Sequence, residues 1–244
     1  MRLLIMMAGM IIPLLTLQGG TMADFASDRF PTSAGEIEIT FIGHGTLMAA
    51  WNGRIVHIDP VSAEADYGRM PKADLILVTH EHSDHLDPAA VDAIRKNGTV
   101  LVYTAACSRK VPGGTVLGNG ESLTAAGIGI EAMPAYNILR ERAPGVPYHA
   151  KGVGNGYVLT FGNLRAYVAG DTEGIPEMKN LKKIDLAFLP MNLPYTMKPE
   201  EAAEAARSFM PKILYPYHYG NTDPERLTAL LAGSGIEVRI RSLR

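Results

Sequence analysis

The sequence Thr79-His80-Glu81-His82-Ser83-Asp84-His85 decides how the rest of the chain is interpreted. It places three histidines and one aspartate within six residues, although the whole 244-residue chain contains only seven histidines. The apolar run at 75–78 predicts a buried strand before it, and Asp87-Pro88 predicts the start of a helix over about residues 89–96. We therefore expect the cluster on a loop between a strand and a helix, where side chains can converge.

The residue types in this stretch predict a metal site. Imidazole nitrogens and carboxylate oxygens suit zinc and similar divalent ions. If the segment is extended, the side chains of His80 and His82 leave the backbone on the same side, so both can reach one ion. Asp84 and His85 follow them and can reach a second ion close by.

The pattern His80-x-His82-x-Asp84-His85 resembles the signature of the metallo-β-lactamase superfamily. The segments 41–46 (Phe-Ile-Gly-His-Gly-Thr) and 169–172 (Ala-Gly-Asp-Thr) are similar to the branch that contains L-ascorbate-6-phosphate lactonase and N-acylphosphatidylethanolamine phospholipase D. The resemblance covers about residues 36–220. It implies an α/β (α+β) fold of the αββα type, in which two mixed β-sheets form a sandwich flanked by helices, with the metal site at one edge.

The resemblance also implies seven ligands for two ions. They are His80, His82 and His149 for one ion, Asp84, His85 and His218 for the other, and Asp171 as a bridge between them. A buried aspartate without a partner would be unfavourable, and a cation is the natural compensation. Two Zn²⁺ ions are expected, and Mn²⁺ or iron would also accept this set of nitrogen and oxygen ligands.

Two residues compete for the third position of the first metal site. Asn137 lies where the resembling branch has a histidine after Pro-Ala, whereas His149 lies 22 residues before Asp171 and fits the general superfamily spacing. Only His149 offers a good zinc-binding atom, because an amide oxygen is a weak zinc ligand. We therefore predict that His149 binds the metal and that Asn137 contacts substrate. The alternative places His149 in the wall of the substrate pocket.

Further residues are expected around the cluster. Asp59 ends a predicted hairpin with the turn Asn52-Gly53, and by resemblance it would orient a metal ligand from behind; the alternative is a turn residue before proline. His44 and Tyr219 are expected to contact substrate. Asp84 is also the predicted catalytic residue, because it can orient a hydroxide and take part in proton transfer.

These features predict a hydrolase that cleaves a lactone, phosphoester or phosphodiester of a small molecule with hydroxide from a dinuclear site. Two alternatives stay open: a mononuclear iron oxidoreductase on the same fold, and a non-catalytic metal-binding protein. Hydrophobic residues make up 47% of the chain, and its net charge of −2 gives no reason to expect nucleic acid. Cys107 is the single cysteine, which excludes an intramolecular disulfide and a cysteine-rich zinc site.

Residues 1–23 predict a secretory signal peptide, with Arg2 before an apolar run at 3–17 and small residues before Asp24. The run is shorter than the roughly 20 residues that a membrane span needs, so no stable span is expected after processing. The alternatives are an uncleaved tether and a misassigned start. Residues 24–35 are predicted as a lead-in and 36–244 as one hydrolase domain, in a periplasmic or secreted protein.

We predict that the mature protein begins near Asp24, because a cleavable signal of this kind is removed during export. N-terminal sequencing of the protein from its native host measures the start directly. A retained Met1 in the soluble cytoplasmic fraction would contradict the prediction.

Overall fold

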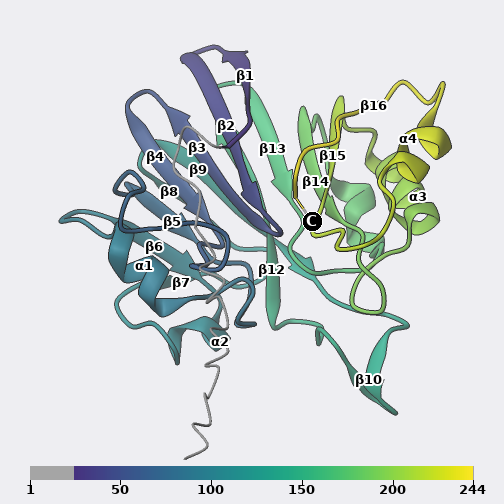
Figure 1. The fold of residues 1–244 in the computed structure, drawn as a ribbon, viewed down its shortest axis with the longest axis horizontal. Coiled ribbons are helices and arrows are strands. Elements are labelled where there is room, and N and C mark those ends of the chain that lie inside the picture. The colour runs from purple at the N-terminus through teal and green to yellow at the C-terminus, as the bar shows by residue number, and fades with distance from the viewer. Residues whose placement is uncertain (1–24, 244) are drawn as a thin grey trace, which may run out of the picture.

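The computed structural model describes residues 25–243, so the predicted signal peptide lies outside the described residues. Two seven-stranded mixed sheets pack against each other, and helices cover their outer sides (Figure 1). The strand order is β1-β2-β3-β4-β5-β6-β7 in the first sheet and β16-β15-β14-β13-β12-β9-β8 in the second. The predicted αββα sandwich is confirmed.

The first sheet is antiparallel from β1 to β4 and parallel from β4 to β7. The Asn52-Gly53 turn joins two of its strands, as predicted, and the Asp87 side chain caps the first helix by accepting from the Ala89 N–H. Its elements are β1 (Ser27–Thr32), β2 (Gly35–Gly43), β3 (Thr46–Trp51), β4 (Arg54–Ile58), β5 (Leu75–Leu77), α1 (Pro88–Ile94), β6 (Val100–Tyr103), α2 (Ala105–Ser108) and β7 (Thr115–Val116).

The second sheet begins antiparallel and becomes parallel from β13 onward. A small hairpin of β10 (Glu141–Ala143) and β11 (Val146–Pro147) projects from the body of the molecule (Figure 1). The other elements are β8 (Ser122–Ala125), β9 (Ile128–Ala135), β12 (Gly154–Phe161), β13 (Leu164–Val168), a 3₁₀ helix (Pro176–Asn180), β14 (Leu186–Pro190), α3 (Pro199–Phe209), β15 (Ile213–Tyr217), α4 (Glu225–Leu231) and β16 (Glu237–Val238).

Apolar side chains from both sheets form one continuous core between them. Phe41 of β2 lies 5.0 Å, between ring centroids, from Tyr215 of β15, and Tyr215 stacks on Phe188 of β14 at the same distance. Such aromatic pairs add about 0.5–1.5 kcal/mol each beyond the area they bury. A second cluster packs the apolar face of α1 against the outer side of the first sheet. Both sheets are therefore fixed relative to each other, and so are the loops at their shared edge.

The segment 24–35, predicted as a lead-in before the domain, contains the edge strand β1. It pairs with β2 in antiparallel register from Ser27 opposite Thr40 to Thr32 opposite Gly35. Only Phe30 of this strand is buried, because an edge strand can leave most of its surface exposed to water. The polar sequence of the segment therefore did not predict a strand. Among residues 25–243, no helix is long and apolar enough to cross a membrane.

Asp28 of β1 ties the edge of the first sheet to the second sheet. Its carboxylate accepts hydrogen bonds from the Tyr215 hydroxyl at 2.5 Å and from the Arg241 guanidinium at 2.7 Å, and its side chain is 13% exposed. Burial raises the pKa of Asp28, but the hydrogen bonds from Arg241 and Tyr215 outweigh this and hold it below its usual value.

We predict that Asp28→Asn lowers the free energy of unfolding by about 1–3 kcal/mol, as expected for losing a hydrogen-bonded charge. Because the folded-state pKa is depressed, this contribution is present above the ordinary carboxyl pKa and lost as the pH falls through the folded value. Urea denaturation of both proteins at several pH values measures it. Arg29→Gln removes only exposed ion pairs on the same strand and serves as the control. Equal stability of Asp28→Asn and wild type at neutral pH would contradict the prediction.

Candidate metal centre

The residues of the metal motifs lie on loops that follow strand ends at one edge of the sandwich. The stretch 79–85 follows β5, Asp171 comes shortly after β13, and His218 directly follows β15. His149 comes from a different direction, on the segment between the β10–β11 hairpin and β12. Because the strands are rigid, the loops hold their side chains in fixed positions.

The structure brings all seven predicted ligands together, and His44 joins them. Within each group the ligand atoms lie within 4.8 Å of one another. The groups are His80, His82 and His149; His44, Asp84, His85 and His218; and His80, His85 and Asp171. They share members, so they form one continuous cluster.

Asp171 lies at the centre of this cluster and is 4% exposed. Its Oδ2 lies 3.2 Å from His149 Nε2 and 3.4 Å from His218 Nε2. Its Oδ1 lies 3.4 Å from His85 Nε2. One buried carboxylate therefore faces histidines of both predicted triads.

Asp59 orients two of the histidines from behind. It is fully buried, and one of its oxygens accepts from His85 Nδ1 at 2.8 Å and from the Thr79 hydroxyl at 2.6 Å. Because the Thr79 hydroxyl donates to Asp59, its oxygen is left to accept from His80 Nδ1 at 3.0 Å. In the neutral form of both rings, the form that binds metal, the proton therefore lies on Nδ1, and the Nε2 lone pair points to the cluster.

Asn137 orients His149 in the same way. Its amide nitrogen donates to the Tyr195 carbonyl at 2.8 Å and to Glu173 at 3.2 Å, which identifies Oδ1 as the acceptor. Oδ1 accepts from the backbone N–H of His149 at 2.7 Å and from its Nδ1 at 2.8 Å. His149 Nε2 is thus left free to face Asp171.

Several atoms that point into the cluster have no hydrogen-bond partner among the described residues. They are Nε2 of His80, His85 and His218, and Oδ1 of Asp171, all buried. A buried polar atom without a partner costs about 1–3 kcal/mol, so a set of four facing one space is unfavourable in the protein alone. Nitrogen atoms of neutral imidazoles and oxygen atoms of carboxylates are the ligands that zinc and similar cations bind. The residues therefore fit a metal centre.

The electrostatics of the cluster agree with this fit. Burial raises the pKa of Asp171, but the surrounding imidazoles, His218 and His85 foremost, hold it well below its usual value. Burial lowers the pKa of His85, but Asp171 and Asp59 outweigh it and raise the pKa to about 9. Burial, reinforced by His85, keeps the pKa of His80 well below its usual value. The carboxylate thus attracts positive charge, and metal ions and protons compete for the same nitrogens.

Three of the seven described non-glycine residues with positive φ lie at the cluster. His44, Asp59 and His218 all have left-handed backbone angles, with φ of 49°, 47° and 48°. For residues other than glycine this conformation costs roughly 1–3 kcal/mol and is retained where the surrounding structure requires it. Gly45 is required beside them, because a Cβ there would lie 2.7 Å from His85 Cε1.

The three predicted substrate contacts are placed differently. His44 lies in the cluster, with Nε2 3.2 Å from Asp84 Oδ2 and its ring centroid 3.8 Å from that of His218. Asn137 faces His149 instead of open space, because its amide is fully used by the protein. Tyr219 is 5% exposed and donates its hydroxyl to the Arg241 carbonyl, which argues against its predicted substrate contact.

Two residues that support the cluster were not predicted from the sequence. Thr79 precedes the histidine motif and transmits the orientation set by Asp59 to His80. Glu173 accepts from the backbone N–H groups of Leu139 at 3.1 Å and Arg140 at 2.8 Å, and it holds the loop that carries Asn137. Both are polar neighbours of motif residues in the sequence, but only the folded chain shows which atoms they contact.

A pocket of about 180 Å³ opens beside the cluster. His80, His82, His149 and Asp171 form one wall, and residues of the β10–β11 hairpin and the following loop, including Arg142 and Tyr148, form the other. A small molecule in this pocket would contact the candidate metal centre directly.

Comparisons with known proteins agree with this geometry. Residues 38–218 match the family model of the β-lactamase superfamily domain. The chain is 32% identical over 222 residues to a UPF0173 metal-dependent hydrolase of Pelotomaculum thermopropionicum, covering 84% of this chain and 97% of the relative. It is 31% identical to one of Thermococcus onnurineus, covering 84% and 96%.

Solved structures give the same result. A Parabacteroides distasonis protein assigned as a metal-dependent hydrolase superposes with a TM-score of 0.87 at 52% identity, covering 90% of this chain and all of the other. The metallo hydrolase Igni18 of Ignicoccus hospitalis superposes with a TM-score of 0.69 at 25% identity, covering 85% and 95%. The chain therefore belongs to the metallo-β-lactamase superfamily and, within it, to the UPF0173 family of metal-dependent hydrolases.

Proposed function

We propose that this protein is a hydrolase with a dinuclear metal site that cleaves a lactone, a phosphoester or a phosphodiester. The observation that carries the proposal is the position of Asp171, whose two oxygens face His149 and His218 on one side and His85 on the other. A carboxylate in this position can bind two cations at once. Zinc fits the imidazole-rich ligand set best, and manganese or iron would also be accepted.

The protein residues have separable roles in this proposal. Two divalent cations, when bound, polarise the scissile group and lower the pKa of a water molecule toward neutrality. His80, His82 and His149 would hold one cation, and His85 and His218 would hold the other together with Asp84. Asp59 and Asn137 fix the orientation of these rings and so keep each ring nitrogen on target.

Asp84 is the residue we assign to proton transfer. Its side chain is 50% exposed, in contrast to the buried Asp171, so it can reach the solvent side of the cluster. Burial raises the pKa of Asp84, but the imidazoles of His218 and His44, whose Nε2 atoms lie 3.6 Å and 3.2 Å from Oδ2, outweigh this and hold the pKa far below its usual value. A carboxylate that stays ionised at this position can accept a hydrogen bond from the attacking water and so orient it for proton transfer.

A hydrolysis screen tests the proposal. The protein, loaded with zinc or manganese, is assayed with lactones, phosphomonoesters, phosphodiesters and phospholipids, and hydrolysis of at least one class is expected to disappear in chelator. Metal analysis of the protein from its native host accompanies the screen. A single iron per chain with no hydrolysis would favour the oxidoreductase alternative and overturn the proposal.

We predict two divalent ions per wild-type chain and loss of both, with activity, in Asp171→Ala, because a bridging carboxylate serves both ions. His149→Ala should retain about one ion. Asn137→Ala should retain two ions with weaker binding, because Asn137 only orients the ring of His149. Elemental analysis and metal titration measure these values, and Asp92→Ala on the exposed face of α1 is the control. Full metal content in Asp171→Ala would exclude the bridge.

We also predict that Asp59→Asn weakens metal binding about 10- to 100-fold, the usual effect of losing a partner behind a metal ligand. An asparagine has one acceptor oxygen and cannot receive all three hydrogen bonds that Asp59 accepts from Thr79 and His85. Competition with a chelating dye gives the affinities. The exposed turn residue Asp66 provides the control Asp66→Asn. An affinity unchanged in Asp59→Asn would show that this network does not support the site.

A further inference from the structure

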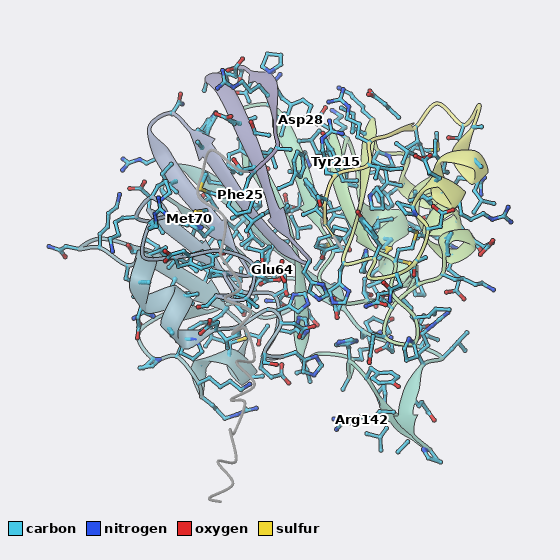
Figure 2. The ribbon with its side chains drawn as sticks, in the orientation of Figure 1. Phe25, Asp28, Glu64, Met70, Arg142 and Tyr215 are labelled. Carbon is cyan, nitrogen blue, oxygen red and sulfur yellow. The ribbon has the colours of Figure 1, made fainter. Side chains whose placement is uncertain are left out.

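The β10–β11 hairpin brings one arginine to the pocket beside the metal cluster. Arg142 is the middle residue of β10 and lies at an irregularity in the pairing of β10 with β11. Arg142 lines the pocket, whereas Glu141 and Ala143 do not. Figure 2 shows Arg142 beside this hairpin, below the body of the molecule. The hairpin is closed by Gly145, whose N–H donates to Glu141 at 2.9 Å.

Arg142 differs from its neighbour Arg140 in its partners. Arg140 is 16% exposed at its side chain and forms ion pairs with Glu173 at 3.4 Å and Glu201 at 2.5 Å. Arg142 is exposed, and no residue from 25 to 243 forms a hydrogen bond or an ion pair with its side chain. Arg140 therefore supports the structure of the loop, and Arg142 keeps its full capacity to bind another molecule.

The lining between Arg142 and the cluster is largely apolar. Val146, Pro147, Tyr148 and Val153 form this part of the wall, and Val146 and Val153 are 38% and 37% exposed. Arg142 is the only lysine or arginine among the described residues that line the pocket.

Besides Asp171 of the metal cluster, one further acidic residue lines this pocket, Glu81 between the two motif histidines. It forms no ion pair with Arg142, and among the described residues its main-chain carbonyl accepts a hydrogen bond from Lys110 Nζ at 2.5 Å. This lysine brings a positive charge next to Glu81 and opposes its effect on an anion in the pocket. Glu81 therefore leaves the guanidinium of Arg142 available to an anion in the pocket.

We propose that Arg142 is a specificity-determining residue that binds an anionic group of the substrate, remote from the bond that is cleaved. This proposal rests on the hydrolytic function proposed above for the same pocket. The substrate class is a small molecule with three parts: the scissile group at the metal cluster, a short apolar spacer along Val146 and Tyr148, and a terminal carboxylate or phosphate at Arg142. The planar guanidinium binds either anion through paired N–H groups.

Titration calorimetry tests the proposal without requiring turnover. The zinc-loaded protein is titrated with the dicarboxylates succinate, glutarate, adipate and pimelate, and with monocarboxylates of the same chain lengths. A single carboxylate can bind at the metal cluster, so the preference for the dicarboxylate isolates the second anionic group. We expect a preference of about 10- to 100-fold at one chain length, as for a hydrogen bond to a charged group.

Substitutions assign this preference to a residue. Arg142→Met keeps the aliphatic stem and should abolish it, whereas Arg142→Lys keeps the charge without the planar fork and should retain only part of it. Arg69→Met removes an exposed arginine that does not line the pocket and should leave the preference unchanged. No preference in the wild type at any length, or a preference that survives in Arg142→Met, would overturn the proposal.

A second set of probes identifies the anion, with phosphonocarboxylates replacing dicarboxylates of the matching length. If the phosphonocarboxylate binds more tightly than the dicarboxylate of the same length, a phosphorylated substrate is indicated. If the dicarboxylate binds more tightly, a carboxylated substrate is indicated. The titrations also separate this proposal from the proposed function. A preference that depends on Arg142 in a protein that hydrolyses nothing would refute the reaction and leave the anion site intact. Hydrolysis by a protein whose preference for dicarboxylates does not depend on Arg142 would support the reaction and refute the anion site.

Discussion

The burial of Asp171 among imidazole nitrogens is the constraint on which the rest of the structure depends. Its carboxylate is 4% exposed, and Nε2 of His80, His85 and His218, which face it, have no hydrogen-bond partners among the described residues. A charge in this position is unfavourable unless a cation accompanies it. The strained backbone at His44, Asp59 and His218 adds a further cost. The fold tolerates both because the sandwich beneath is large and closely packed, and a bound metal ion would offset the desolvation.

The two sheets contribute different parts of this centre, and Asp59 aligns ligands of both predicted triads from the side of the first sheet. The first sheet supplies the stretch 79–85 and the turn with His44, and the second supplies Asp171 and His218. Asp59, at the end of β4, contacts His85 directly and His80 through Thr79. It therefore aligns one predicted ligand of each triad. The orientation of both sites depends on a single buried carboxylate.

The sequence predicted what local patterns control. The Asn52-Gly53 hairpin and the helix start at Asp87 follow from turn and capping chemistry, and the structure has both. It did not predict β1, because an edge strand needs little apolar surface. Asn137 was predicted to contact substrate, because an amide oxygen is a weak zinc ligand and His149 was the better candidate for the metal. The contact of Asn137 with His149, 12 residues away, depends on how the intervening hairpin folds back, and composition does not encode this.

That intervening hairpin joins metal binding to substrate selection. Asn137 and His149 are hydrogen bonded through backbone and side chain at the base of the segment, with Asn137 N–H donating to the His149 carbonyl at 2.9 Å. Arg142 lies on the segment between them. Because the predicted ligand His149 lies at the end of this segment, a shift in the hairpin would move that ligand and the proposed anion site together. Glu173 limits such a shift by holding the backbone at Leu139 and Arg140. With His149 as the predicted ligand, instead of a histidine at position 137, the geometry of the candidate metal centre would depend on the same segment that carries the proposed anion site.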